Sequence, residues 1–384
     1  MHFELSEEQL MIQKAARDFA INECLPGVIE RDEKQQFPKE QISKLADLGF
    51  MGMMVEEKYG GAGLDTASYV LAMEEISKVD ASVSVCMSVN NSLVCWGVEK
   101  YATEEQKQRY LVPLAQGKKD GELYIGAFLL SEPEAGSDAT SQHTTAEDKG
   151  DHYILNGTKN WITNGNSASV YLVIAQTDVS KGSKGINVFI VEKNTPGITV
   201  GAKENKLGIR GSDTHSIMFQ DVKVPKANRI GEDGFGFTFA MKTLAGGRIG
   251  IAAQALGIAS GAYERAVAYS KQRKAFGKEI AQHQAIQFKL ADMATRIEAA
   301  RLLCLRAAWE KDNGIDYTLS SSMAKVYASE TAMWVTTEAV QVHGGYGFVK
   351  EYHVERLMRD AKITQIYEGT SEVQRIVIGR SILK

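Results

Sequence analysis

The chain of 384 residues has few cysteines and histidines, and each shortage argues against a class of protein. The cysteines, Cys24, Cys86, Cys95 and Cys304, lie far apart in apolar stretches and form no CxxC pair. This spacing favours buried, reduced thiols over a disulfide framework or a zinc site, and a reducing cytoplasm is the simplest compartment. The seven histidines have no metal-ligand spacing, so no metal site is expected.

The sequence also lacks a strong charge bias and, as we interpret it, any apolar run long enough to span a bilayer. Its net charge is -4, without a basic tail or an arginine-rich stretch, which argues against nucleic acid as the main partner. No signal-peptide pattern precedes the capping box that begins at Ser6. We therefore expect no membrane insertion and a fold that begins near Met1.

Several common catalytic motifs are missing. There is no HExxH, no GxSxG and no P-loop, which argues against zinc proteases, α/β-hydrolases and P-loop nucleotidases. The glycine-rich hexamer at 231–236 follows a polar loop rather than the first strand of a βαβ unit. We therefore interpret it as a loop that leads into a helix, not as a dinucleotide site.

Secondary-structure signals divide the chain into three parts. Residues 1–122 have helix signals, including Pro38 before one expected helix, Gly49 after it and a second capping box at Thr103. Short runs rich in Val, Ile, Tyr and Phe predict strands at 123–130, 152–155, 169–175, 186–191 and 216–219. Helical periodicity returns in 233–384, at about 234–272, 281–313, 317–343, 350–364 and 371–382. The sequence predicts an α+β fold with an N-terminal helical domain (1–122), a middle antiparallel β domain (123–232) and a C-terminal helical bundle (233–384).

Glu368 is the first candidate for chemistry, because it falls in the short break between the last two expected helices, beside Gly369. Flanked by Ile366 and Tyr367, this carboxylate is placed to face an apolar cleft. Desolvation there would raise its pKa toward neutrality, which suits a general base that removes a proton next to a carbonyl. The alternative is an acidic residue that complements a helix N-terminus.

Other stretches suit a flat, polar-edged cofactor. The loop 131–138 follows an expected strand and offers backbone amides and small hydroxyls, while Trp161 and Thr163 offer an aromatic face beside a hydroxyl. A tight turn and an ordinary core tryptophan are the alternatives. Arg273 ends one long helix and either complements its C-terminus or grips a pyrophosphate. The glycines that follow Gln341 suit either a helix end or close approach to a ligand.

Taken together, these stretches resemble the acyl-CoA dehydrogenases, most closely their short-chain (butyryl-CoA) branch. The resemblance covers essentially the whole chain and rests on the segments 131–138, 161–163, 207–212, 247–250, 273–277, 341–347 and 358–370. It implies a middle β domain between an N-terminal helical domain and a C-terminal four-helix bundle, with non-covalent FAD between the sheet and the bundle. It also implies a homotetramer, built as a dimer of dimers, that passes electrons to an electron-transferring flavoprotein.

The resemblance assigns roles to individual positions. Glu368 matches the family's catalytic base, which removes the α-proton of an acyl-CoA thioester while the β-hydride passes to flavin N5, giving a trans-2-enoyl-CoA. The positions that match cofactor contacts are Ser131, Ser137, Trp161, Thr163 and Thr370, and, from a neighbouring subunit, Arg273, Phe276, Gln284, Gln341 and Gly345. The positions placed near the acyl-CoA are Ser137, Arg248, Tyr367 and Gly369.

Three positions bear on which branch the chain resembles. Some branches carry the base at the position of Gly247, which cannot serve, and this supports Glu368. Ala245 stands where most relatives have an Asp that helps to hold the CoA chain. Trp96 stands where short-chain relatives have a small residue, on a helix that borders the acyl pocket, so its bulk is expected to shorten that pocket.

Other functions within and beyond the family stay open. Enoyl-CoA reduction in the reverse direction and dehydrogenation of a branched or aryl acyl-CoA are the closest alternatives. An acyl-CoA oxidase usually has a longer chain, a nitroalkane-oxidase-like enzyme has a different base at position 368, and a scaffold protein would not need Glu368. The resemblance suits a bacterial cytoplasm, or a mitochondrial matrix for a mature eukaryotic form.

Overall fold

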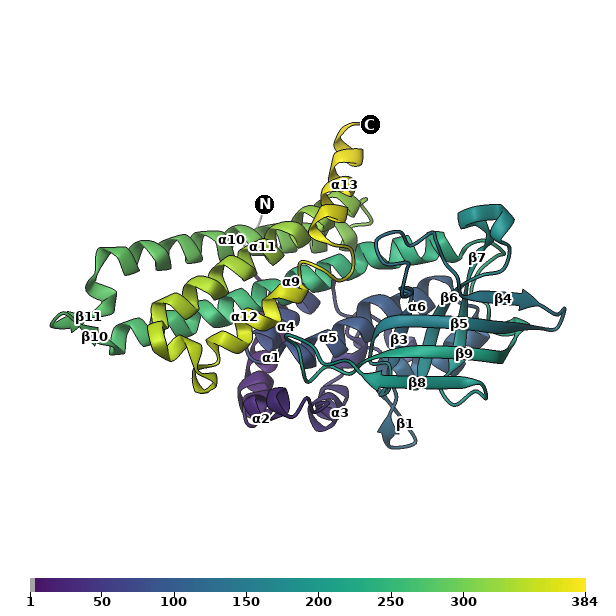
Figure 1. The fold of residues 1–384 in the computed structure, drawn as a ribbon, viewed down its shortest axis with the longest axis horizontal. Coiled ribbons are helices and arrows are strands. Elements are labelled where there is room, and N and C mark those ends of the chain that lie inside the picture. Colours follow the sequence, from purple (N-terminus) through teal and green to yellow (C-terminus); the bar gives the residue numbers. More distant parts are fainter. Residues whose placement is uncertain (1–3) are drawn as a thin grey trace.

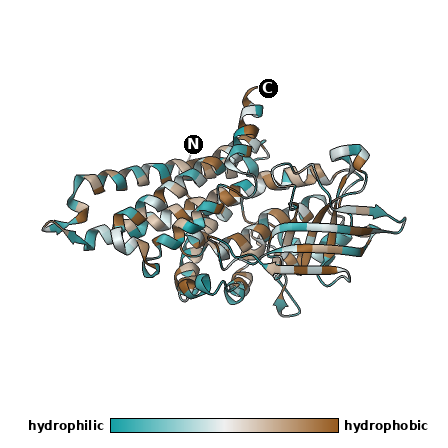
Figure 2. Ribbon diagram, in the orientation of Figure 1, coloured by the Kyte–Doolittle hydropathy of each residue, from teal (hydrophilic) through white to brown (hydrophobic). Residues whose placement is uncertain are grey.

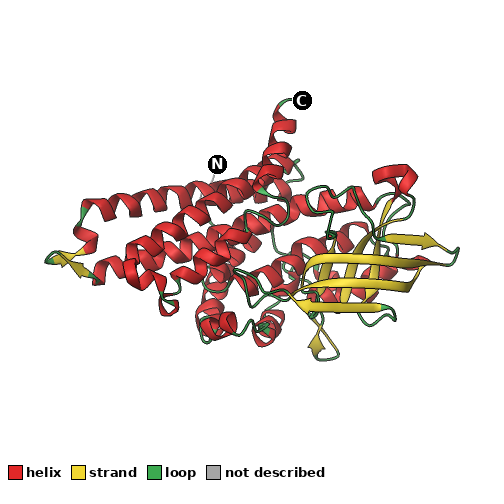
Figure 3. Cartoon of the chain, in the orientation of Figure 1, coloured by secondary structure: helices red, strands yellow, loops and turns green. Residues whose placement is uncertain are grey.

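The computed structural model describes residues 4–384; Met1, where the fold was expected to begin, lies outside them. The molecule is elongated, with a β-sheet toward one end and helices along the rest (Figure 1, Figure 3). The N-terminal part is helical: α1 (Glu7–Phe19), α2 (Val28–Glu33), α3 (Lys39–Asp47), α4 (Thr66–Ser77), α5 (Ala81–Ser88), α6 (Trp96–Tyr101), α7 (Glu104–Gln106) and α8 (Val112–Gln116). Both expected capping boxes, at Ser6 and Thr103, are present.

The main sheet has seven strands. They are β3 (Gly126–Leu129), β4 (Thr145–Asp148), β5 (His152–Thr163), β6 (Val170–Gln176), β7 (Ile186–Glu192), β8 (Ile198–Lys203) and β9 (Thr214–Pro225), in the order β3-β6-β4-β5-β9-β8 with β7 paired to β6. Its long strands carry apolar and polar residues in alternation (Figure 2), because one face packs inward and the other does not. β6 is buried along its whole length.

The sheet departs from the sequence analysis in two details. The expected helix–sheet–helix order is confirmed. The sheet is mixed and not antiparallel throughout, because β6 pairs parallel with β3 and β4 and antiparallel with β7. Two strands, β4 and β8, were not predicted. β4 is short and mostly exposed, and β8 contains Gly201, so neither shows the apolar run that marked the other strands. A small hairpin, β1 (Lys118–Lys119) with β2 (Glu122–Leu123), precedes the sheet.

The C-terminal part is the expected bundle of long helices. It consists of α9 (Gly236–Gln272), α10 (Gln284–Asp312), α11 (Thr318–His343), α12 (Val354–Ile363) and α13 (Ser371–Ile382), with the hairpin β10 (Lys274–Ala275) and β11 (Lys278–Glu279) between α9 and α10. The helices α9, α10 and α11 pack against one another, and α12 packs on α9 and α11. The β10–β11 hairpin lies at the end of the bundle opposite to the sheet (Figure 1).

The continuous helical segment Ala81–Tyr101 corrects one expectation. By length and composition alone it could cross a membrane, since its most apolar stretch has a mean hydropathy of 1.2. That stretch is 94% buried inside the protein, however, where the segment contacts α9 and β3. Its apolar character is therefore accounted for by burial in the core. The four cysteines are likewise buried as free thiols.

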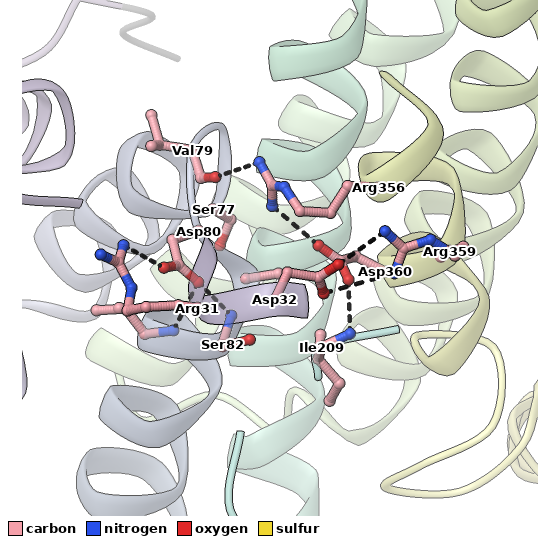
Figure 4. A network of polar contacts seen from close by, with 12 residues as sticks. Arg31, Asp32, Ser77, Val79, Asp80, Ser82, Ile209, Arg356, Arg359 and Asp360 are labelled. Carbon is pink, nitrogen blue, oxygen red and sulfur yellow. Dashed lines mark hydrogen bonds and ion pairs between the residues drawn. The ribbon is translucent and has the colours of Figure 1, made fainter. Parts of the chain in front are cut away.

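A buried ionic network joins distant parts of the chain and holds α12 in place (Figure 4). Asp360 accepts the backbone N–H of Ile209 at 2.5 Å and pairs with Arg356 at 3.1 Å. Arg359 reaches back to Asp32 on α2 at 2.8 Å. Burial raises the pKa of Asp360 to about 6, against the opposing charge of Arg356. Because α12 leads directly into the turn that carries Glu368, this network holds one side of that turn in place.

Candidate active site

Glu368 lies in a tight turn between α12 and α13, as the sequence predicted. The backbone of Glu368 has a φ of 53° and that of Gly369 a φ of 91°, so two successive residues are in conformations with positive φ. A positive φ is unstrained for glycine but unfavourable for glutamate. The turn ends at Thr370, whose hydroxyl accepts the N–H of Val373 and caps α13. The unusual backbone is therefore built into the helix break.

Buried side chains from three helices hold this turn. Gln374 on α13 donates to the carbonyl oxygens of Glu368 at 3.2 Å and Gly369 at 2.9 Å. Lys325 on α11 donates its Nζ to the carbonyl oxygen of Gly369 at 2.7 Å. The hydroxyl of Tyr367 donates to Gln254 on α9. These contacts determine the backbone geometry that sets the direction of the Glu368 side chain.

The carboxylate of Glu368 points at Gly247 on α9. A Cβ atom added to Gly247 would overlap with Glu368 Oε2 and would lie 3.1 Å from Glu368 Cδ and 2.7 Å from Leu93 Cδ2. Glu368 Oε2 is buried and has no hydrogen-bond partner among the described residues. Burial raises the pKa of Glu368 to about 7, although the cations of Lys325 and Arg248 oppose the rise. The turn thus presents a half-buried carboxyl group, with one oxygen buried and unpaired, that exchanges a proton near neutral pH.

Arg248, expected near the substrate, is buried on the same turn of α9. Its guanidinium donates to the Ser322 hydroxyl on α11 at 3.2 Å, and its Nε has no partner among the described residues. Burial lowers its pKa, and Glu368 opposes that change. Arg248 therefore brings positive charge to the side of the bundle that Glu368 faces.

The predicted cofactor residues of the sheet gather at a β-bulge. The pairing of β5 with β9 shifts register between Lys159 and Ile162, and Trp161 lies inside this shift with a φ of 61° and 60% of its surface exposed. Ser131 is adjacent, since its carbonyl accepts the N–H of Asn160 at 2.8 Å, and Thr163 follows on the same strand. An exposed indole beside two hydroxyl side chains suits the face and polar edge of a flat ring.

The loop after Ser131 is anchored from below by a buried ion pair. Lys159 is fully buried and donates to Glu132 at 2.7 Å and to the Leu130 carbonyl at 3.0 Å. Glu132 in turn accepts the backbone N–H groups of His143 and Thr144. Ser137, at the loop surface, is exposed. Hydrogen bonds therefore hold the start of the loop in place at Glu132, and the side chain of Ser137 is accessible.

The remaining predicted cofactor residues lie at the opposite end of the molecule. This group lies around the β10–β11 hairpin and the end of α11, at the end of the bundle opposite to the sheet (Figure 1), and consists of Arg273, Phe276, Gln284, Gln341 and Gly345. All five are exposed, Phe276 to 96%. Two of them, Arg273 and Gly345, line a cavity of about 600 Å³ together with Tyr346. The two groups lie in different parts of the molecule, and the role of the second group toward a neighbouring subunit stays a prediction.

Sequence reasoning missed the residues that support the turn. Lys325 and Gln374 are both completely buried, although most other buried positions of their helices are small or apolar. A lysine on the inward face of α11 was the available signal, because buried lysines are rare unless paired. Leu93, which would meet a Cβ at Gly247, belongs to a π-helical segment (Val89–Cys95) that periodicity alone does not reveal.

Two further positions that the sequence analysis singled out are now placed. Ala245 is buried on α9, near Gly247 and Arg248. Trp96 is half-buried at the start of α6 and packs edge-on against Tyr101, with ring centroids 5.8 Å apart. Tyr101 contacts Phe235 and Phe239 at the beginning of α9. Trp96 thus belongs to an aromatic cluster between the N-terminal helices and α9.

Comparisons with known proteins cover the whole chain. Residues 6–118, 127–222 and 234–383 match the acyl-CoA dehydrogenase N-terminal, middle and C-terminal domains. A short-chain specific acyl-CoA dehydrogenase from Clostridium acetobutylicum is 50% identical over 384 residues, covering 100% of both chains. The structure of butyryl-CoA dehydrogenase from Megasphaera elsdenii has a TM-score of 0.97 and 52% identity over 100% of both chains. A chain from the structure described as the electron transferring flavoprotein of Acidaminococcus fermentans has a TM-score of 0.98 and 51% identity, again over 100% of both.

Proposed function

The chain belongs to the acyl-CoA dehydrogenase family, and we propose that it is a flavin-dependent enzyme that desaturates short-chain acyl-CoA thioesters between the α- and β-carbons. Glu368 removes the α-proton in this reaction. FAD, the cofactor of the family, supplies the acceptor for the hydride that leaves the β-carbon. The product is a trans-2-enoyl-CoA, and an electron-transferring flavoprotein takes up the electrons.

The observation that carries the proposal is the state of the Glu368 carboxyl group. Its Oε2 atom is buried without a hydrogen-bond partner among the described residues, and burial raises its pKa to about 7. A base with a pKa near the working pH is available in its ionised form and is still basic enough to accept a carbon-bound proton. The alternative was an acidic residue whose only role is to complement the dipole of a helix N-terminus. Such a residue would be exposed to solvent and would have an ordinary pKa.

The backbone around Glu368 suits the other half of proton abstraction. The N–H of Glu368 makes no hydrogen bond with any part of the chain that the structure describes. A free N–H on the residue that carries the base is placed to donate to the thioester oxygen as negative charge develops there. Arg248 adds positive charge from α9. The turn therefore combines a base with a donor for the enolate-like oxygen.

The sheet cluster fits an isoalloxazine ring. Trp161 exposes its ring at a bulge, the backbone of Ser131 bonds to the neighbouring Asn160, and Thr163 follows on the same strand; an indole and two hydroxyl residues suit stacking and hydrogen bonds to the ring edge. Arg273 and Gln341 would hold the rest of FAD from the neighbouring subunit of a homotetramer. The Thr370 hydroxyl, which caps α13, is a further contact beside the base.

The test of the proposal is Glu368→Gln, with Glu372→Gln as a matched control on the exposed first turn of α13. Glu368→Gln should keep FAD and lose flavin bleaching by butyryl-CoA under anaerobic conditions. A positioned base contributes about 10²–10⁴-fold to proton transfer, and loss of the sole base costs at least that much. Glu372→Gln should bleach like the wild type. Wild-type bleaching by Glu368→Gln would remove Glu368 from the mechanism.

For the substrate we propose straight chains of about four to six carbons, since each excluded methylene removes ~0.8 kcal/mol of burial. The relatives named for short-chain substrates and the bulk of Trp96 support this preference. Branched or aryl thioesters are the second candidate, because Ala245 replaces the Asp expected beside the CoA chain. Anaerobic bleaching with straight, branched and aryl acyl-CoAs separates the two. Reduction of crotonyl-CoA by reduced enzyme tests the reverse direction.

The relatives point to two cellular compartments. Similar enzymes occur in bacteria and in mitochondria. We propose the bacterial cytoplasm, or the mitochondrial matrix for a mature eukaryotic form. Fractionation of the source cells, with the enzyme followed by its flavin bleaching, tests the assignment.

A further inference from the structure

Lys325 is completely buried in the bundle, beside the turn that carries Glu368, and the mechanism above does not use it. We propose that Lys325 is a positioning residue that locks the Glu368 turn through the Gly369 carbonyl and, through its charge, keeps Glu368 ionised for proton abstraction. The proposal rests on the proposed function, in which Glu368 is the base. It assigns a role to a residue that neither contacts the acyl chain nor accepts the proton.

The first support is the geometry of the turn. Lys325 Nζ lies 2.7 Å from the Gly369 carbonyl oxygen, and Gln374 Nε2 lies 2.9 Å from the same atom. Two buried donors from different helices therefore converge on one carbonyl. Because Glu368 has a φ of 53°, its backbone needs such contacts to stay in place. The donors hold the peptide that follows the base and so fix where its carboxylate points.

The second support is that Lys325 has no other hydrogen-bonded partner within residues 4–384 of the structure. A buried ammonium group is costly, and one hydrogen bond to a carbonyl is weak compensation. A neutral amide side chain could donate the same kind of hydrogen bond to the Gly369 carbonyl at lower cost. The charge itself is therefore the feature to explain, and the nearby carboxyl group of Glu368, with its unpaired Oε2, is its natural counterpart.

The charged and titratable groups around Glu368 come from every neighbouring element. Lys325 faces it from α11, Arg248 from α9 and Tyr69 from α4, and Tyr367 is its neighbour in the turn. Glu372 on α13 faces Lys325 but is exposed. Burial lowers the pKa of Lys325 to about 8, so it is still mainly a cation at neutral pH. Lys325 and Arg248 are thus the two cations that oppose the burial of the Glu368 carboxylate.

Burial raises the pKa of Glu368, and the Lys325 charge counteracts that rise. Removal of this charge should therefore favour the protonated, inactive form of Glu368. In Lys325→Met, which also lacks the donor, the pKa of Glu368 should rise by about one pH unit or more. The acidic limb of flavin reduction by butyryl-CoA should move to higher pH by the same amount. Gln374→Leu is the matched control, because it removes the other donor to the Gly369 carbonyl without removing a charge. Gln374→Leu should slow flavin reduction without moving the acidic limb of its pH profile.

The experiment titrates the holoenzymes by infrared difference spectroscopy and by single-turnover flavin reduction. The band of the protonated Glu368 carboxyl group is assigned by its loss in Glu368→Gln, so its titration is read without turnover. We expect a higher midpoint for Lys325→Met in both measurements and a wild-type midpoint for Lys325→Arg and Gln374→Leu. If Lys325→Met does not fold, Lys325→Gln is the second neutral variant.

The outcomes separate this proposal from the proposed function. If Lys325→Met keeps the wild-type midpoint, or shifts it no more than Gln374→Leu does, Lys325 only packs and the inference is overturned. If Glu368→Gln itself bleaches like the wild type, the assignment of the base fails, whatever Lys325 does. A shifted midpoint together with an inactive Glu368→Gln supports both.

Discussion

Gly247→Ala should inactivate the enzyme while leaving it folded, because the added methyl group would occupy the place of the Glu368 carboxylate. A Cβ atom there overlaps with Glu368 Oε2 and comes within 2.7 Å of Leu93 Cδ2. Both are ends of flexible side chains, so the clash is relieved by their movement and not by the backbone. In the interior of a helix, alanine is more stable than glycine by roughly 0.5–1 kcal/mol, so the variant should remain folded.

The rate should fall because the base moves. To restore ordinary van der Waals separation, the carboxylate must withdraw by about 1 Å. A misplacement of about 1 Å costs on the order of 10² in rate when a reaction depends on close approach of the reacting groups. We therefore expect a loss of about 10²-fold in the rate of flavin reduction by butyryl-CoA. The assay is anaerobic stopped-flow reduction, with FAD content and thermal unfolding measured on the same samples.

The adjacent glycine supplies the control. A Cβ atom at Gly246 meets nothing closer than the Tyr317 hydroxyl oxygen, at 3.8 Å, which is ordinary contact. Gly246→Ala makes the same change of helix propensity one residue away and should reduce its flavin at the wild-type rate. If Gly247→Ala also kept the wild-type rate, the Glu368 carboxylate would not lie where the structure places it and the reasoning would be refuted.

Four other predictions follow from the same structure. In the wild type, kcat/KM should increase with pH through about 7, the pKa to which burial raises Glu368, because only the ionised form accepts a proton; a limb near the ordinary glutamate value would contradict this. Lys159→Met should leave Glu132 buried and unpaired, destabilise the protein by ~3–5 kcal/mol in denaturant unfolding and weaken FAD retention; unchanged unfolding would mean that the ion pair is dispensable. Trp96→Gly should shift the optimum of kcat/KM toward longer acyl chains, and an unchanged optimum would mean that Trp96 only packs against Tyr101. Arg273→Ala should lose FAD and loosen the oligomer together, as flavin absorbance and sedimentation would show, whereas a stable, flavin-loaded wild-type monomer would argue against a shared site.

Local sequence signals determined a large part of the fold. The capping boxes at Ser6 and Thr103, the long apolar periodicity after Gly236 and the strand runs each depend on neighbours within a few residues, so they were readable without coordinates. The helix break at Glu368 was readable for the same reason. The strands β4 and β8 were missed because neither has the apolar run that marks a buried strand, and each is held in the sheet by pairing with the strand that follows it along the chain.

The resemblance to a family named the candidate site residues, but the sequence alone could not say how they are supported. Only the tertiary structure brings Lys325 and Gly247 to Glu368, because these residues come from two helices that are far from the turn along the chain. Only the tertiary structure also places the main sheet and the β10–β11 hairpin at opposite ends of the molecule (Figure 1). Residue types and spacing determine which helices and strands can form. Packing between them decides which carboxyl group is buried, which charge faces it and which glycine must stay a glycine.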